Sequence, residues 1–315
     1  MAARWNTQLP FCARMGMAMS SEAALIAALR ALAPHPAARG LADDAAVLEF
    51  GNEALVLTHD MMVEGVHWLP GQDPADVAYK LVAVNLSDLA AKGAEPLGVL
   101  LGYTLGPDDA RFVEGLGEVL AEFGVPLLGG DTVSAPAGSA RAIGLTALGR
   151  ATCRPVPSRL GARVGDEVWV TGALGGAMLG FEAVRDGIYS VDTRAFRRPR
   201  PLLTEGRALA PLVSAMMDIS DGLLLDASRM AQASGVTIVL DAAAVPLAEG
   251  ISQARRHDAL TWGDDYQLLF TCEPGCLLPT TTPVRIGTVV APVDHAVLLD
   301  GTPPAGALGF EHGPT

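Results

Sequence analysis

The chain contains almost no lysine. Of its 22 basic residues only Lys80 and Lys92 are lysines, and 35 acidic residues bring the formal net charge to −13. A protein that binds nucleic acid presents a basic face to the phosphates, so this charge argues against such a partner. The shortage also excludes the P-loop, which needs a lysine between glycine and serine or threonine, because Lys80 follows tyrosine and Lys92 follows alanine.

Cysteines are few, and long apolar runs are absent. Cys12, Cys153, Cys272 and Cys276 fit no disulfide framework in 315 residues. The last two could form half of a zinc site, but a structural site needs about four ligands, so we interpret all four as reduced thiols of a cytoplasmic protein. No apolar run approaches the roughly 20 residues that span a membrane. Residues 1–18 contain arginine but no acidic residue, which resembles a targeting sequence, yet we interpret them as a loose start.

Half of the residues are apolar, which supplies a large core and argues against disorder. Helices are predicted at 22–32, 74–92, 108–123, up to 185 and at 223–233, and strands at 47–50, 54–58, 99–105, 125–128, 142–148, 167–171, up to 217 and at 237–240, 267–271 and 285–290. This alternation predicts an α/β protein with mixed sheets and two domains, residues 19–155 and 156–315. Their junction is expected in 152–164, which carries two prolines and three arginines.

Aspartates gather at predicted strand ends and in the loops beside strands. They are Asp43 and Asp44 before a strand, Asp60 just past one, Asp131 at the end of one, Asp218 and Asp221 between a strand and a helix, and Asp264 and Asp265 before a strand. These are the places where open α/β sheets usually bind ligands. The pattern therefore predicts a polar site formed by segments far apart in the sequence.

Asp88 lies on the apolar face of a predicted helix. Val77, Leu81, Val84 and Asp88 are spaced by four, three and four residues, so they share one face. An unpaired carboxylate there would cost several kcal/mol, and it needs an arginine, helix-capping amides or a metal ion. One such aspartate is more often a structural hydrogen-bonding group, but several together favour a metal.

Hard oxygen ligands without paired histidines or cysteines favour Mg²⁺ or Mn²⁺. Calcium is the alternative, but the chain has no EF-hand loop. Without a P-loop, phosphate binding would fall to backbone amides, arginine and the metal. Gly129 and Gly130 allow close backbone approach, and residues 220–222 begin a predicted helix whose N-terminus favours anions. The glycine-rich 172–180 is either another phosphate loop or a helix-packing segment, and we favour packing.

Seven segments, in this order, resemble the thiamine-monophosphate kinase family. They are GLADDAAVL (40–48), THDMMVEGVHW (58–68), DPADVAYKLVAVNLSDLAAKGAEP (73–96), LLGGDT (127–132), GRATCR (149–154), DISDGL (218–223) and GDDYQLLF (263–270). The family belongs with aminoimidazole ribonucleotide synthetase, selenophosphate synthetase and a hydrogenase-maturation protein. The resemblance implies their two-domain α/β fold, a homodimer and an ATP site at the domain boundary.

The resemblance also implies a reaction: Mg²⁺-dependent transfer of the ATP γ-phosphoryl group to thiamine monophosphate, giving thiamine diphosphate and ADP. It implies several Mg²⁺ ions held by Asp43, Thr58, His59, Asp60, Asp88, Asp131, Asp218 and Asp221; ATP contacts from Gly130, Asp131, Arg154 and Ser220; substrate contacts from His67, Asp264 and Phe310; and catalytic roles for Asp131, Asp221 and Arg154. The acceptor is already an anionic phosphate oxygen, so no general base is required, and positive charge and positioning should suffice.

The sequence departs from the family pattern at a few positions. His59 replaces a usual threonine, and Asp264 and Gln267 stand in GDDYQ where GEDYE is common. Trp68 and Trp262 either stack on the cationic thiazolium or pack in the core. Two alternatives remain: another ATP-dependent enzyme of the superfamily, such as one like aminoimidazole ribonucleotide synthetase, or an inactive regulator that binds nucleotide or thiamine.

Overall fold

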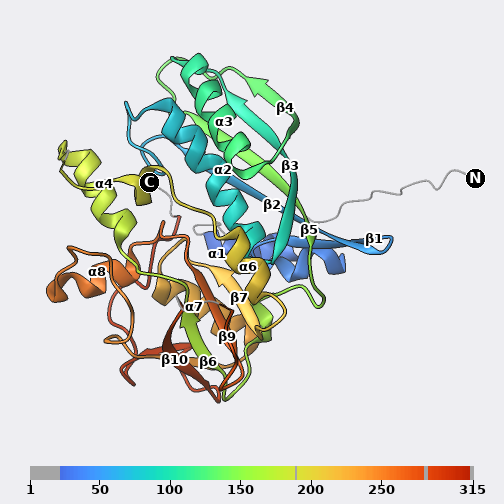
Figure 1. The fold of residues 1–315 in the computed structure, drawn as a ribbon, viewed down its shortest axis with the longest axis vertical. Helices are drawn as coiled ribbons and strands as arrows, with labels where there is room; N and C mark the ends of the chain where they lie inside the picture. Colours follow the sequence, from blue (N-terminus) through green and yellow to red (C-terminus); the bar gives the residue numbers. More distant parts are fainter. Residues whose placement is uncertain (1–21, 189, 280–282, 313–315) are drawn as a thin grey trace, which may run out of the picture.

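The computed structural model describes residues 22–188, 190–279 and 283–312. The predictions for residues 1–18 and Cys12 lie outside the described residues. Two β-sheets dominate the molecule, one formed by the first half of the chain and the other by the second (Figure 1). The prediction of an α/β protein built on two mixed sheets is therefore confirmed.

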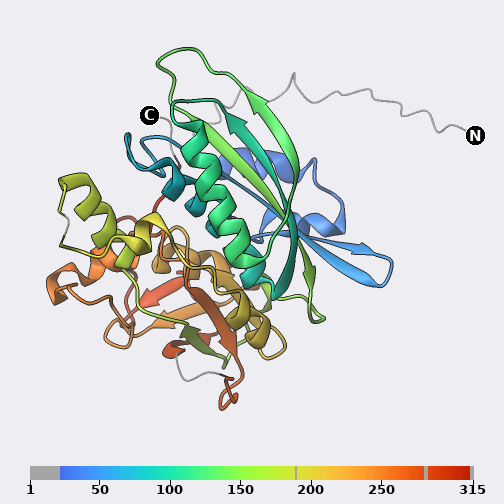
Figure 2. The ribbon, with the colours of Figure 1, turned by 45° about the horizontal axis from the view of Figure 1, so that its top comes forward.

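The first sheet has five strands in the order β1-β2-β5-β3-β4. They are β1 (Ala46–Phe50), β2 (Glu53–Val63), β3 (Ala94–Thr104), β4 (Leu127–Val133) and β5 (Ala142–Ala151). Only β3 and β4 pair in parallel, and the other neighbours are antiparallel. The β1–β2 hairpin extends from the body of the molecule (Figure 2).

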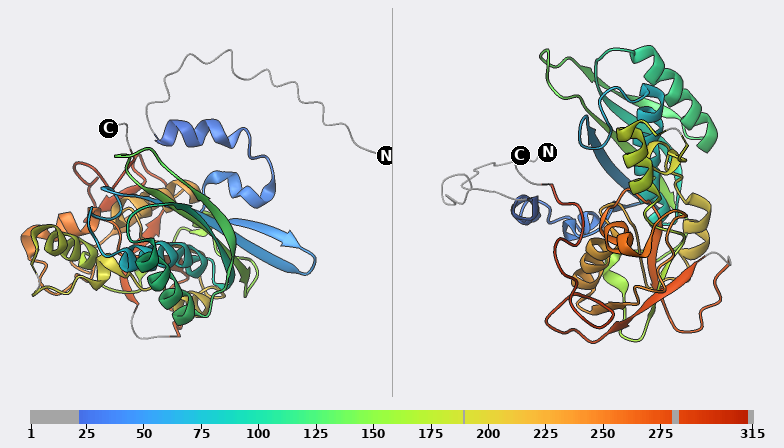
Figure 3. Two further views of the ribbon diagram at one scale, coloured as in Figure 1. Left: turned by 90° about the horizontal axis from the view of Figure 1, so that it is seen from above. Right: turned by 90° about the vertical axis from the view of Figure 1, so that its left-hand side faces the viewer.

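Two long helices lie on one side of this sheet (Figure 1). α2 (Pro74–Ala91) begins at the predicted residue, with Pro74 in the first helical position. The structure adds a cap, because the Asp73 side chain accepts a hydrogen bond from the Ala75 N–H. α2 is buried along almost its whole length, and α3 (Asp109–Phe123) packs beside it through Phe112, Leu116 and Val119. α1 (Glu22–Arg30) has no buried residue and lies at the edge of the molecule (Figure 3).

The second sheet has six strands in the order β11-β8-β10-β6-β9-β7. They are β6 (Glu167–Val170), β7 (Ala215–Asp218), β8 (Thr237–Leu240), β9 (Leu268–Cys272), β10 (Val284–Val290) and β11 (Val297–Leu299), and the helices of this half are α4 (Gly176–Asp186), α5 (Arg194–Arg197), α6 (Leu203–Leu209), α7 (Leu223–Ser234) and α8 (Arg256–Thr261). Short 3₁₀ turns lie at Pro36–Leu41, Arg159–Gly161 and Gln253–Arg255. The sequence did not predict α5, α6, α8 or β11, which are three to seven residues long.

The two halves are closely packed against each other. A Cβ atom on Gly206 of α6 would come 2.1 Å from the backbone oxygen of Ala90, so α6 lies directly on the end of α2. Both Arg197 and Arg198 form ion pairs with Asp76 of α2. The first sheet ends at Ala151 and the second begins at Glu167; we propose that the domain boundary lies near residue 155, in the predicted junction.

Two predicted strand ends are wrong. β2 continues from Thr58 to Val63 because its side chains go on alternating between buried and exposed and pair with β5, so Asp60 lies within the strand. β4 likewise continues through Asp131 to Val133. Among the described residues, no helix is both long enough and apolar enough to cross a membrane.

Candidate active site

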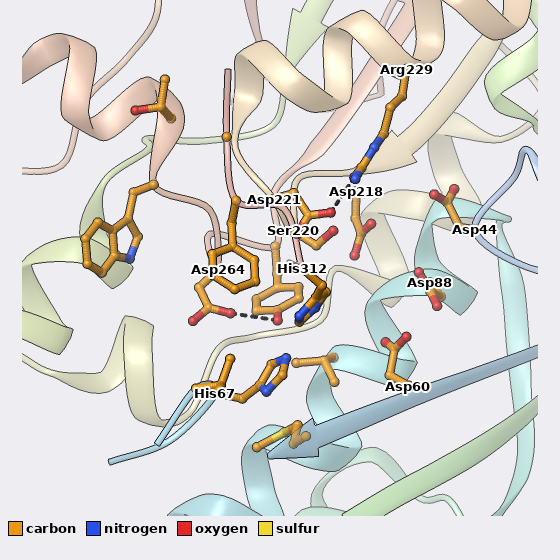
Figure 4. A pocket seen from close by; sticks show the side chains of 18 of the residues that line it. Asp44, Asp60, His67, Asp88, Asp218, Ser220, Asp221, Arg229, Asp264 and His312 are labelled. Carbon is orange, nitrogen blue, oxygen red and sulfur yellow. Dashed lines mark hydrogen bonds and ion pairs between the residues drawn. The ribbon is translucent and has the colours of Figure 1, made fainter. Parts of the chain in front are cut away.

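A cavity of about 880 Å³ lies between the two halves of the molecule. Most of the carboxylates collect at one end, and the aromatic side chains lie at the other end together with Asp264 (Figure 4). The lining residues used below are Asp43, Asp44, Asp60, His67, Lys80, Asp88, Arg159, Phe181, Asp218, Ser220, Asp221, Arg229, Trp262, Asp264, Tyr266, Phe310 and His312. They come from both sheets, so the cavity depends on the packing of the two halves.

Three carboxylates form a compact cluster at the acidic end. One oxygen each of Asp44, Asp88 and Asp218 lies within 4.8 Å of the others. Asp88 enters from α2 and Asp218 from the end of β7, while Asp44 precedes β1. The Thr58 hydroxyl donates to Asp88, and the Ser87 hydroxyl donates to Asp218 at 2.6 Å. Asp88, on the apolar face of α2, therefore points at two other carboxylates and the Thr58 hydroxyl, and not at an arginine.

Burial and mutual repulsion disturb the protonation of these groups. Desolvation, and then the neighbouring Asp44 charge, raise the pKa of Asp218 to about 8. The same two causes raise the pKa of Asp60 to about 6. Desolvation, followed by the charges of Asp60 and Asp218, raises the pKa of Asp88 well above its ordinary value. Among the described residues, Asp88 and Asp218 have no basic partner, unlike Asp44, which pairs with Lys92 and Arg159, and a divalent cation would relieve the remaining repulsion.

Asp43 does not belong to this cluster, although its neighbour Asp44 does. Oδ1 of Asp43 lies 2.5 Å from Nζ of Lys92, and Oδ2 lies 2.5 Å from Nη1 of Arg39. The Lys92 and Arg39 charges outweigh desolvation, so the pKa of Asp43 lies below its ordinary value. The structure therefore places Asp44, rather than the predicted Asp43, beside Asp88 and Asp218, although Asp44 also pairs with Lys92 and Arg159.

Two arginines, Arg159 and Arg229, line the acidic end of the cavity, and the predicted Arg154 does not. Arg159 lines the cavity, and its Nε donates to Asp44 Oδ1 at 2.6 Å. Arg154 is exposed, lies 2.5 Å from Glu49 at the start of the β1–β2 turn, and is not among the lining residues. Arg154 and Arg159 both lie in the junction segment 152–164, and no local pattern indicates which of the two side chains points into the cavity.

Three other predicted residues lie away from the cavity. Asp131 and His59 lie on the face of the first sheet opposite α2. Asp131 pairs across the sheet with Gly102 of β3, which in turn pairs with Gly144 of β5. Nδ1 of His59 is 2.9 Å from the hydroxyl of Thr146, also on β5. A Cβ atom on Gly130 would come 2.0 Å from the backbone oxygen of Leu101. Glycine at this position therefore allows the β4 backbone to lie close to β3, and not close to a ligand in the cavity. A single chain does not bring these residues to the acidic cluster.

In both segments considered for phosphate binding, backbone N–H groups donate to aspartates of the chain itself. Asp226 Oδ2 accepts from the backbone N–H groups of Ser220 and Asp221. Asp265 accepts from the N–H groups of Gly175 and Ala177 at the start of α4. The packing interpretation of 172–180 is therefore favoured, and the backbone at 220–221 is fixed by Asp226, which the sequence analysis missed.

The opposite end of the cavity carries the predicted substrate residues. His67, Asp264 and Phe310 all line it, and the Phe310 ring lies 4.9 Å from the His312 ring (Figure 4). Trp262 packs against Phe181 in the wall, with ring centroids 5.1 Å apart. Trp68 is buried in the core instead. Of the two tryptophans left open by the sequence, only Trp262 can reach a ligand.

Two family models match the chain. AIR synthase related protein, N-terminal domain, matches residues 42–151, and AIR synthase related protein, C-terminal domain, matches residues 163–281. Each match covers one of the two sheets, except that β10 and β11 lie beyond the second.

Curated relatives and solved structures agree on a narrower group. Thiamine-monophosphate kinase of Escherichia coli K12 is 35% identical over 74% of this chain and 75% of its own length. That of Caulobacter vibrioides is 39% identical over 76% of this chain and 72% of its own. A solved complex of AaThiL with AMPPCP and TMP superposes with a TM-score of 0.83 at 28% identity, covering 93% of this chain and 97% of that one. The chain belongs to the thiamine-monophosphate kinase family.

Proposed function

We propose that the chain transfers the γ-phosphoryl group of ATP to thiamine monophosphate, giving thiamine diphosphate and ADP as a step of thiamine diphosphate synthesis in the cytoplasm. The observation that carries this proposal is the division of one cavity into an acidic and an aromatic end. The acidic end suits metal-bound phosphates, and the aromatic end suits a flat cationic heterocycle. The relative solved with AMPPCP, an analogue of ATP, and TMP supports the same pair of ligands.

The carboxylates fit Mg²⁺. Mg²⁺ prefers oxygen ligands and bridges a few carboxylates to substrate phosphates, and the cluster of Asp44, Asp88 and Asp218 offers oxygens only. Asp60 and Asp221 line the same end, and Thr58 touches Asp88. We propose these six residues as the ligands that one chain supplies. When bound, Mg²⁺ would supply the positive charge that counters the charge of the transferring phosphoryl group.

The chain's own residues would position the two reactants. Arg159 and Arg229 are the arginines at the acidic end; the first pairs with Asp44 and the second with Asp221. Their guanidinium groups can donate to phosphate oxygens in a fixed geometry. Ser220, fixed through its N–H by Asp226, offers a hydroxyl at the same place. Transfer then needs alignment of two polyanions and no proton abstraction.

Incubation of the purified chain with ATP, Mg²⁺ and thiamine monophosphate tests the reaction. Thiamine diphosphate can be followed by its fluorescence after oxidation to thiochrome. Product that requires Mg²⁺ and vanishes with EDTA supports the proposal. A folded chain that binds ATP but forms no product would instead be the inactive regulator, and faster turnover of a phosphoribosyl substrate would identify another enzyme of the superfamily.

Arg159 and Arg154 are expected to differ strongly on substitution. Arg159→Met should lower kcat by about 10²-fold, the loss typical of a group that stabilises transition-state charge. Arg154→Met should leave kcat within about twofold, because an exposed ion pair contributes little. Steady-state kinetics of both variants measure this. Equal losses of kcat would contradict the proposal that Arg159, rather than Arg154, contacts the phosphates.

We also propose a homodimer, formed through the face of the first sheet that α2 does not cover. Met61 and Leu100 lie on this face and are 55% and 40% exposed. Leu128 and Val133 of the edge strand β4 lie on the same face and are exposed as well. Apolar side chains concentrated on one open sheet face are typical of an interface. Asp131 lies on this face and would approach the second chain. We therefore propose that Asp131 and Gly130 perform their predicted roles in the dimer.

Charge introduced on this face should separate the dimer. Leu100→Asp is expected to halve the molecular mass measured by light scattering, because a carboxylate would be buried unpaired in the interface. Val113→Asp on α3 is the control, since Val113 is exposed on the opposite side of the domain. A Leu100→Asp protein with the mass of the wild type would contradict an interface at this face.

A further inference from the structure

Lys80 is buried in the wall of the aromatic end of the cavity, and the reaction described above gives it no role. Its side chain is 1% exposed, although it extends from the middle of α2. Nζ donates to the Asp264 carboxylate at 2.7 Å and to the backbone oxygen of His67 at 3.0 Å. It also lies 4.2 Å from the centre of the Phe196 ring. Lys80 thus connects the first half of the chain to two segments of the second.

The Asp264 carboxylate is held on both sides. Oδ2 accepts from Lys80, and Oδ1 accepts from the Tyr266 hydroxyl at 2.9 Å. The Asp264 backbone is in the left-handed region, with φ of 59°. The Asp264 side chain is one quarter exposed and lines the cavity. Its remaining lone pairs are therefore fixed in direction, which suits a ligand that donates hydrogen bonds.

His67 is oriented from its other side. Its Nδ1 accepts a hydrogen bond from the Val63 N–H at 3.0 Å, so the neutral ring carries its proton on Nε2. Lys80 holds the carbonyl of the same residue. The wall therefore presents one acceptor, Asp264, and one donor, His67, both anchored to a single ammonium group.

We propose that Lys80 is a positioning residue for the phosphate acceptor: it fixes Asp264 so that this carboxylate, together with His67, can bind a heterocycle that carries an amino group beside a ring nitrogen. This inference rests on the proposed function, in which the aminopyrimidine of thiamine monophosphate has that pattern. Lys80 acts through Asp264 and does not touch ATP, because the carboxylate cluster lies at the other end of the cavity.

Kinetics of full-length variants test this role. Lys80→Met should raise KM for thiamine monophosphate by roughly 10- to 100-fold, the loss expected when a hydrogen bond to a charged group disappears. KM for ATP should change by less than about threefold. The matched control is Arg197→Met, which removes another link between α2 and the second half, leaves Asp76 paired with Arg198, and does not concern a lining residue of this cavity. It should leave both KM values unchanged.

The double variant Lys80→Met/Asp264→Asn separates positioning from a merely structural role. If Lys80 acts through Asp264, the double variant should match Asp264→Asn alone in KM for thiamine monophosphate. It also leaves no unpaired charge, so it carries the test if Lys80→Met does not fold. An unchanged KM for thiamine monophosphate, or an equal rise in both KM values, would overturn the role of Lys80. A wild-type chain that forms no thiamine diphosphate would overturn the proposed function itself.

Discussion

Replacing Asp88 by asparagine is expected to lower kcat by about 10²- to 10³-fold, the cost of losing one group that stabilises the transition state, and to raise the Tm of the metal-free protein. The two effects have one cause. Asp88 adds a charge to a buried cluster whose members already repel one another. Without metal this charge destabilises the fold, and with metal it holds the ion that the reaction needs.

The stability of the metal-free protein should also depend on pH in a particular direction. Asp60 and Asp218 have an ordinary pKa of 3.8 and folded-state values of about 6 and about 8. The folded state therefore binds more protons than the unfolded state between pH 4 and 8, so stability falls as pH rises through that window. In EDTA, Tm should be lower at pH 8 than at pH 5, and saturating Mg²⁺ should reduce the difference.

Differential scanning fluorimetry and steady-state kinetics on the same samples measure both effects. Asp186→Asn removes the same charge from an exposed position, where Asp186 pairs with Arg185, and it should change neither Tm nor kcat. An Asp88→Asn protein that loses stability in EDTA would show that Asp88 is a structural hydrogen-bonding group rather than a metal ligand. A Tm that rises with pH in EDTA would contradict the raised pKa values of Asp60 and Asp218 in the folded state.

Lys92→Met is expected to lower the free energy of unfolding by about 3–5 kcal/mol, the cost of removing one partner from a buried ion pair. Nζ of Lys92 lies 2.5 Å from both Asp43 and Asp44, and all three side chains are buried. Burial favours the neutral amine, yet the two carboxylates outweigh it and raise the pKa of Lys92. The methionine side chain fills similar space but leaves two buried carboxylates with arginine partners alone.

Urea unfolding in EDTA measures the loss, with Arg111→Met as the matched control. Arg111 also pairs with two carboxylates, Asp73 and Glu114, but all of these side chains are exposed. Its replacement should cost no more than about 1 kcal/mol. Equal losses in the two variants would show that burial does not make the Lys92 pairs important.

Much of the fold could be read locally. The capped start of α2 at Asp73 and Pro74 and the apolar face that carries Asp88 depend on residues within a few turns of one another. The strand pattern of both sheets was visible for the same reason. The short elements α5, α6, α8 and β11 were missed, because segments of three to seven residues have little periodicity and are stabilised by packing.

The direction in which a side chain points, and contacts between residues far apart in the sequence, could not be predicted from local patterns. Asp43 and Asp44 are adjacent, yet only Asp44 joins Asp88 and Asp218, and Asp131 faces the opposite side of its sheet from Asp60 because of strand register. Lys80 and Asp264 are 184 positions apart. The sequence by itself determined the two-domain α/β class, the family and the kinds of residues in the site. Only the tertiary structure decided which of them meet, because the cavity is formed by packing between the halves and no local pattern encodes that contact.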